Sequence, residues 1–207
     1  MSELTSNGQG WRLAALSLAM LLPSLGISVA NIALPSLRAA FDVSSQEAQW
    51  VVIAYLVVVT SSLVTAGRLG DLLGRRPLLL AGIAIFSLAS LGAVLAPTIW
   101  VVVLARAIQG VGAAMMMSLT VAAVSDAVPA ERSGTAIGLL GTVSAIGTAA
   151  GPSLGGLLIG MFGWPSIFVL MAGAGLVAAL FIGTQLPAVA TVHRRPAFDV
   201  PRALALM

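Results

Sequence analysis

Long apolar runs separated by short polar stretches dominate the pattern of hydrophobic and polar positions along the chain. A run of roughly 20 apolar residues is needed for a helix to cross a bilayer. Runs of this kind cover residues 13–35, 48–67, 77–96, 99–125, 134–161 and 164–186. The pattern therefore predicts an all-α membrane protein in which six transmembrane helices form one bundle over residues 13–186, with a polar N-terminal tail at residues 1–12.

Composition supports this prediction and argues against several classes of function. The chain is 59% hydrophobic and only 8% charged, whereas soluble domains usually carry about 25% charged residues. Cysteine is absent, and the single histidine, His193, has no second ligand near it, so we expect no metal site. We find no catalytic constellation and no phosphate-binding glycine loop. The sequence predicts neither an enzyme nor a cofactor.

The arginines predict which way the bundle lies in the membrane. Alternate connecting segments and the two tails contain Arg12, Arg68, Arg75, Arg76, Arg132, Arg194, Arg195 and Arg202. The opposite segments contain only Arg38. Because arginine is retained on the cytoplasmic side, both termini are predicted to be cytoplasmic, in a membrane of the bacterial inner (plasma) type. Since the arginines are dispersed among loops, we expect no nucleic-acid partner.

The stretch from Gly67 to Arg76 is the most charged part of the chain and is predicted to be a short turn between the second and third spans. It reads Gly-Arg-Leu-Gly-Asp-Leu-Leu-Gly-Arg-Arg. A basic loop is common in bacterial membrane hairpins, but this spacing is more specific. It resembles the Gly-x-Leu-x-Asp-x-x-Gly-Arg-Arg signature of major facilitator superfamily transporters. The matching positions are Gly67, Leu69, Asp71, Gly74, Arg75 and Arg76.

This resemblance implies a cytoplasmic charge cluster that latches one conformation of the transporter. The latch would comprise Gly67, Asp71, Gly74, Arg75, Arg76 and Asp126. Asp126 lies at the cytoplasmic end of the fourth span, where it is either a solvated loop acid or the ion-pair partner of Arg75 or Arg76.

Arg106 lies inside the fourth span, where an arginine costs about 2.5–3.5 kcal/mol on insertion scales. It either snorkels to the nearby outer interface or has a functional partner or a water-filled cavity. Gln109 follows three residues later and shares its helix face. Arg106-x-x-Gln109-Gly110-x-Gly112 resembles the fourth-helix motif of the superfamily, which implies that Arg106 takes part in proton transfer beside Gln109.

The fifth span is rich in small residues, which allow another helix to pack closely. Gly147-x-x-x-Gly151-Pro152-x-x-Gly155-Gly156 resembles the fifth-helix motif of the superfamily's antiporters. Pro152 removes one backbone donor and is expected to kink the helix. We expect Gly151 to lie at a seam with the other half of a transporter, the alternative being ordinary packing within the bundle.

The end of the first span, Ala30-Asn31-Ile32-Ala33-Leu34-Pro35, together with Trp50 and Tyr55, resembles the fourteen-helix group of drug:proton antiporters. That group commonly has an aspartate where this chain has Gly26, and the acidic residues of this chain all fall in tails, loops or span ends. The site at which the coupling proton titrates is therefore not evident.

The superfamily fold has two six-helix bundles with the substrate between them, so the chain corresponds to the N-terminal bundle. Residues 187–207 resemble the cytoplasmic linker leading to a seventh helix. We expect a proton-coupled multidrug efflux antiporter, present as a half or a truncated form, whose partners are the bilayer, a small lipophilic substrate, protons, and a C-terminal half or second copy. The alternative is a half-size, non-transporting membrane protein that dimerises or binds a full-length transporter. In either case a lone bundle is expected to expose Arg106 and Gln109 to lipid.

Overall fold

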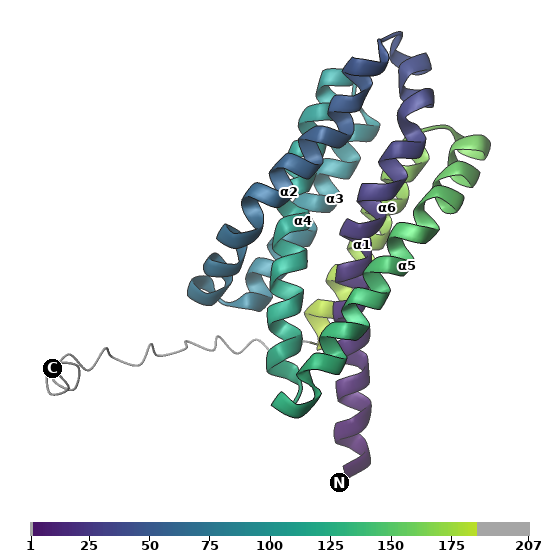
Figure 1. Cartoon of the computed structure of the whole chain (residues 1–207). Coiled ribbons are helices and arrows are strands. Elements are labelled where there is room, and N and C mark those ends of the chain that lie inside the picture. Colours follow the sequence, from purple (N-terminus) through teal and green to yellow (C-terminus); the bar gives the residue numbers. More distant parts are fainter. Residues whose placement is uncertain (1, 186–207) are drawn as a thin grey trace, which may run out of the picture.

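The computed structural model describes residues 2–185, except for the side chains of residues 2–9, 126–127, 130 and 185. Within this range the chain forms six long helices joined by short turns (Figure 1). They are α1 (Ser2–Phe41), α2 (Ser45–Leu73), α3 (Arg75–Val94), α4 (Ile99–Ala127), α5 (Ala130–Phe162) and α6 (Pro165–Gln185). All six are long and apolar enough to cross a membrane. The predicted six-span, all-α architecture is confirmed, and the predicted linker at residues 187–207 lies outside the described residues.

The first helix continues further than its apolar run, past Pro35 to Phe41. Proline is tolerated inside membrane helices because neighbouring groups can satisfy the carbonyl it leaves without a donor. The helix stops at Asp42, whose φ of 50° is left-handed. Aspartate enters that region more readily than most residues do.

The start of α2 is determined by a capping box. The Ser44 hydroxyl accepts a hydrogen bond from the Glu47 backbone nitrogen at 3.2 Å, and the Ser44 nitrogen donates to Glu47 Oε2 at 2.9 Å. The two bonds satisfy donors that a helix N-terminus leaves without partners. The helix therefore begins at Ser45, three residues before the predicted span.

The predicted ten-residue turn between the second and third spans is almost entirely helical, which corrects the sequence prediction. Helix α2 continues to Leu73 and α3 begins at Arg75, so Gly74 alone reverses the chain. Its φ of 92° is a conformation that glycine adopts at no steric cost. Pro77 falls in the first turn of α3, where no intrahelical donor is needed.

The helices form two groups of three, which Figure 1 shows side by side. Helix α4 packs extensively on α2 and α3, while α1 packs on α5 and α6. Contacts between α3 and α6 and between α1 and α4 join the groups. The turn at Gly74 and the α4–α5 turn lie at the same end as the start of α1, as an alternating bundle requires (Figure 1).

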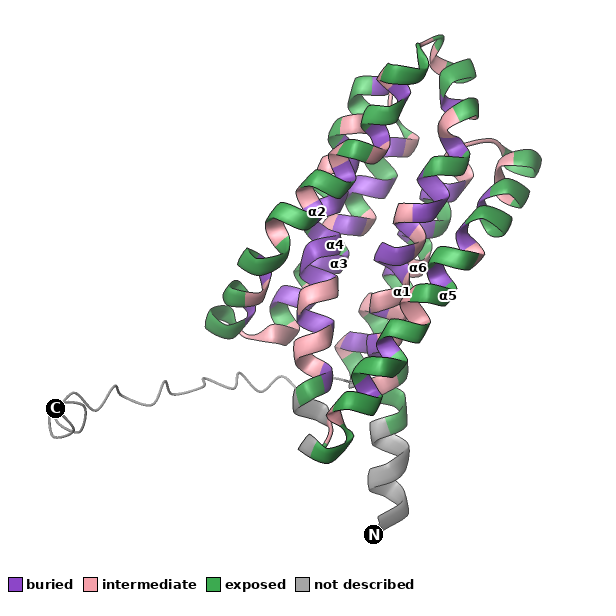
Figure 2. Cartoon of the chain, viewed as in Figure 1, coloured by how far each residue is buried: buried purple, intermediate pink, exposed green. Residues whose placement is uncertain are grey.

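Burial differs strongly between helices (Figure 2). Helices α1 and α4 are the most buried, whereas α2 and α5 are the least. Exposed side chains on α2, such as Val57 and Val64, are as apolar as those in the core. This is expected of a surface that faces lipid or another membrane helix, because lipid tails are as apolar as leucine.

Glycine allows α4 to approach α2 and α3 closely. A Cβ atom at Gly112 would lie 2.5 Å from the Gly82 carbonyl oxygen and 2.7 Å from the Phe86 nitrogen, both in α3. On the other side of α4, a Cβ atom at Gly67 of α2 would lie 2.8 Å from Ser118 Oγ. Gly70 of α2 leaves room for the side chain of Leu119. These contacts follow the rule that small residues drive the packing of membrane helices.

The α5 glycines lie on two different faces of a helix that continues through Pro152 without interruption. Gly147, Gly151 and Gly155 contact α1, and a Cβ atom at Gly151 would collide with the Ser28 side chain. Gly156 has no neighbour within 4 Å, and Pro152 is exposed. Gly151 therefore packs inside the bundle, which was the alternative considered from the sequence. The expectation that it lies at a seam with the other half is wrong.

We expect Gly151→Leu to weaken the contact between α1 and α5. Overpacking a close contact costs about 1–3 kcal/mol, so the variant should unfold at a lower temperature in detergent. Gly156→Leu is the matched control, because it adds the same side chain where no neighbour lies within 4 Å. Equal losses of stability in the two variants would contradict the assignment of this seam.

We expect Gly112→Ala to destabilise the α3–α4 contact, because the atoms it would meet belong to the backbone and cannot rotate away. Gly92→Ala in α3, where a Cβ atom has nothing within 4 Å, is the control. The amount of folded protein after a temperature ramp measures the difference. A Gly112→Ala variant as stable as the Gly92→Ala variant would show that the two backbones separate easily.

Candidate functional site

Arg106 is fully buried in the middle of the bundle, with 0% of its surface exposed. It projects from α4, and its neighbours Leu104 and Ile108 are exposed while Ala105 is buried. The face of α4 that carries Arg106 therefore points inward. Arg106 therefore does not extend to the outer interface, which was one of the two hypotheses from the sequence.

Three hydrogen bonds hold the guanidinium group. Arg106 Nε donates to the Val51 carbonyl oxygen in α2 at 3.2 Å, and one terminal nitrogen donates to the Gly26 carbonyl oxygen in α1 at 2.9 Å. The other terminal nitrogen donates to Gln109 Oε1 at 2.5 Å. The shared face predicted for Arg106 and Gln109 thus becomes a direct contact.

An aromatic ring provides the fourth contact. Arg106 Cζ lies 3.9 Å from the centroid of the Tyr55 ring in α2. Tyr55 is fully buried, and its hydroxyl donates to the Pro23 carbonyl oxygen at 3.0 Å. A cation over an aromatic face is attracted to the negative charge of the ring's quadrupole.

The positive charge of Arg106 is compensated by neutral groups. The described acidic side chains lie at helix ends or in turns, and the one ion pair that they form joins Asp71 to Arg75. Hydrogen bonds to a charged group contribute about 1.5–3 kcal/mol each, and a desolvated cation–π contact contributes about 2 kcal/mol. These interactions oppose the cost of about 2.5–3.5 kcal/mol that insertion scales give for an arginine inside a membrane span. Among the side chains that the structure describes, no carboxylate contacts the guanidinium group.

Gln109 extends the network to α3 and α6. Its Nε2 atom donates to Ser90 Oγ in α3 at 2.6 Å and lies 3.5 Å from the Met171 sulfur in α6. Ser90 in turn donates to the carbonyl of Phe86, one turn earlier, at 2.7 Å. We refer to Gly26, Val51, Tyr55, Ser90, Arg106 and Gln109 as the arginine network, which ties together α1, α2, α3 and α4 and contacts α6 through Met171.

The expectation that a lone bundle exposes Arg106 and Gln109 to lipid is wrong. They are 0% and 1% exposed, because α1 and α2 contact Arg106 while α3 and α6 contact Gln109. Sequence reasoning also missed the role of Ser90, which no periodicity distinguishes from the other small residues of α3. Tyr55 was singled out in the sequence by a family resemblance, but its contact with Arg106 was not predicted.

The charged end of the bundle contains the predicted latch residues. Arg75 donates to the Ala122 carbonyl oxygen in α4 at 2.7 Å and to Asp71 Oδ1 at 3.2 Å. Arg76 donates to the Gly183 carbonyl oxygen in α6 at 2.6 Å. Both arginines reach the C-terminal parts of other helices, where the macrodipole favours positive charge. The side chain of Asp126 lies outside the described residues, so its predicted ion pair stays a prediction.

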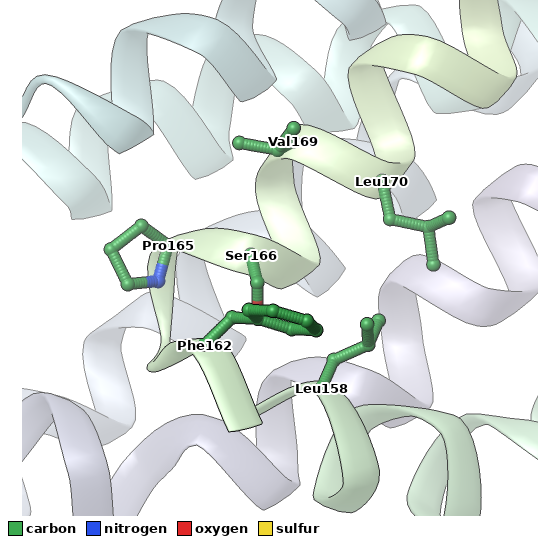
Figure 3. A pocket seen from close by; sticks show the side chains of 6 residues that line it. All are labelled: Leu158, Phe162, Pro165, Ser166, Val169 and Leu170. Carbon is green, nitrogen blue, oxygen red and sulfur yellow. The ribbon is translucent and has the colours of Figure 1, made fainter. Parts of the chain in front are cut away.

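An apolar hollow lies at the opposite end, beside the α5–α6 turn (Figure 3). Its volume is about 470 Å³, and it is lined by Leu158, Phe162, Pro165, Ser166, Val169 and Leu170. The Ser166 hydroxyl is engaged with the Gly163 carbonyl oxygen at 2.6 Å. The hollow offers a ligand apolar contact but no charge. Among the described residues, no group of acidic or histidine side chains could hold a metal ion.

Comparison with known proteins identifies the family. The model described as Major Facilitator Superfamily matches residues 16–205. The riboflavin transporter RibZ of Clostridioides difficile (strain 630) is 35% identical over 193 residues, which is 93% of this chain and 42% of RibZ. The multidrug resistance protein Stp of Mycobacterium tuberculosis (strain CDC 1551 / Oshkosh) is 40% identical over 128 residues, 61% of this chain and 24% of Stp.

Solved structures agree on the fold. The proton:xylose symporter XylE bound to 6-bromo-6-deoxy-D-glucose superposes with a TM-score of 0.79 at 16% identity, over 88% of this chain and 46% of XylE. A bacterial homologue of the human lysosomal transporter Spinster, in an inward-facing conformation, gives 0.78 at 18% identity, over 96% of this chain and 47% of the homologue. This chain therefore spans less than half the length of these relatives. It is a multi-pass membrane protein that belongs to the major facilitator superfamily of transporters.

Proposed function

We propose that the chain forms the N-terminal bundle of a proton-coupled antiporter that exports small lipophilic compounds. The observation that carries the proposal is the arginine network, in which a permanently charged residue is enclosed at the centre of a membrane bundle. Such a residue is costly and is by default functional. Export by an antiporter is supported by the resemblance of the α5 glycine motif to that of antiporters and by the name of the relative, multidrug resistance protein Stp.

The chemistry proposed for Arg106 is electrostatic. A guanidinium group stays protonated over the physiological range, so it does not itself release the coupling proton. Its charge instead lowers the affinity of neighbouring groups for protons and cations within a low-dielectric interior. Because its partners in the described bundle are neutral, the carboxylate that exchanges the proton belongs to another part of the transporter.

The latch residues are proposed to hold one conformation at the cytoplasmic end. Arg75 and Arg76 connect the α2–α3 turn to α4 and α6 through backbone carbonyls. The Asp71–Arg75 ion pair is exposed, with 64% of the Asp71 side chain accessible, and exposed pairs contribute only about 0–1 kcal/mol. Contacts this weak can open and close during a transport cycle.

The least-buried helices, α2 and α5, are the faces that a second six-helix bundle would cover, supplied by a C-terminal half or a second copy. With both termini cytoplasmic in a bacterial inner membrane, the turn at Gly74 faces the cytoplasm. The substrate would then bind between the two bundles near the midplane.

Transport by the protein with both bundles, reconstituted into vesicles with an imposed pH gradient, tests this function. We expect export of a lipophilic dye that stops when the gradient is collapsed. Arg106→Ala should reduce proton-driven export to roughly a tenth of the wild-type rate or less, because lost charge stabilisation of this kind costs at least about 1.4 kcal/mol.

Arg132→Ala is the matched control, because it removes an arginine that is exposed near the start of α5. Detergent size-exclusion profiles establish that each variant remains folded. If the wild-type protein exports no dye under any gradient, the proposed efflux function is wrong. Normal export by Arg106→Ala would instead limit Arg106 to a structural role.

A further inference from the structure

We infer that Tyr55 is a positioning residue, which holds the Arg106 guanidinium in one place and thereby makes its charge usable in transport. The effect on transport rests on the proposed function, whereas the contact between Tyr55 and Arg106 rests on the geometry of the structure. Nothing in the sequence motifs gives Tyr55 this role.

The hydrogen bonds of Arg106 leave one direction of movement open. A guanidinium group is planar and donates in its own plane, so the bonds to Val51, Gly26 and Gln109 resist movement within that plane. Movement perpendicular to the plane is resisted by a group that lies against its face. Arg106 Cζ lies over the Tyr55 ring, 3.9 Å from its centroid, so we infer that the ring supplies this resistance.

The Tyr55 ring is itself held in place. Its hydroxyl donates to the Pro23 carbonyl oxygen in α1 at 3.0 Å, so both ends of the side chain are attached to different helices. Gly26 leaves space for the ring, because a Cβ atom at that position would lie 3.3 Å from the Tyr55 hydroxyl oxygen. The backbone of α1 can then approach both the ring and the guanidinium, and the Gly26 carbonyl accepts from Arg106.

This arrangement makes the position of Arg106 depend on α2. Two of the four contacts, the Val51 carbonyl and the Tyr55 ring, belong to that helix. Helix α2 packs most extensively on α4, so the Arg106 guanidinium lies at the interface of these two helices and its environment depends on how they fit together. A shift of α2 relative to α4 would displace the carbonyl and the ring together and would change the environment of the charge.

The first experiment measures position without using transport. The chain contains no cysteine, so Val51→Cys supplies a single buried reporter, one helical turn before Tyr55 on the same face. In membranes, its reaction with a water-soluble thiol reagent should be slow. Adding Tyr55→Leu should raise the labelling rate about thirtyfold, the factor that corresponds to losing a desolvated cation–π contact of about 2 kcal/mol, because the released guanidinium admits water.

Two control variants separate positioning from packing. Tyr55→Phe keeps the aromatic face and should raise labelling only about two- to threefold, the effect of losing one neutral hydrogen bond. Phe168→Leu removes an equally buried ring from α6, whose ring contact is with Trp164, and should leave labelling nearly unchanged. If Tyr55→Leu does not fold, Tyr55→Met is used in its place. The inference is overturned if Val51→Cys reacts no faster in the Tyr55→Leu or Tyr55→Met background than in the Phe168→Leu background.

The second experiment connects position to function. In the transporter with both bundles, Tyr55→Leu should lower proton-driven export about tenfold and alter its pH profile, whereas Tyr55→Phe should restore the wild-type profile. Reduced export with an unchanged pH profile would mean that Tyr55 is only a packing residue. If the wild-type protein exports nothing while the labelling results hold, the efflux proposal fails and the positioning role of Tyr55 stands.

Discussion

The bundle depends on how one arginine charge is accommodated away from water. Arg106 is enclosed by carbonyl oxygens, an amide and an aromatic face, and no described carboxylate contacts it. Neutral dipoles are sufficient because several act on the same charge in a medium of low dielectric constant. The partners must then come from several helices, because one helix uses most of its own carbonyl capacity internally. The same interaction that stabilises the charge therefore fixes α1, α2 and α4 relative to one another.

Close backbone contact makes this arrangement possible. The carbonyl of Gly26 can reach Arg106 because the position has no side chain to hold α1 away from Tyr55. Gly112 similarly brings α4 against α3, from which Ser90 reaches Gln109. In a bilayer, hydrophobic burial gives little preference for one helix pair over another, so packing and interhelical hydrogen bonds decide the contacts. The arginine network therefore depends on the close helix contacts that the glycines allow.

The two ends of the bundle differ in chemistry. At the end with the Gly74 turn, Arg75 and Arg76 bind carbonyls of α4 and α6. At the other end, the hollow beside Phe162 and Pro165 is apolar and contains no charged lining residue. The contacts at the first end are partly buried and join α4 and α6 to the α2–α3 turn through charged donors.

The sequence by itself determined the number and type of helices, because the length of an apolar run is a local property that the bilayer thickness selects. It also determined that Arg106 and Gln109 share a face, since positions three apart on a helix are neighbours. The superfamily motifs were recognisable for the same reason, as they are contiguous in the chain.

Only the tertiary structure decided which helix each face meets. The partners of Arg106 in α1 and α2 are 80 and 55 residues away in the sequence. Gly151 was expected at an outer seam and lies against Ser28 instead. In a membrane the lipid-facing and core-facing sides of a helix are both apolar, so hydrophobic periodicity does not reveal its rotation. That rotation is set by the shapes of side chains that meet only after the helices assemble.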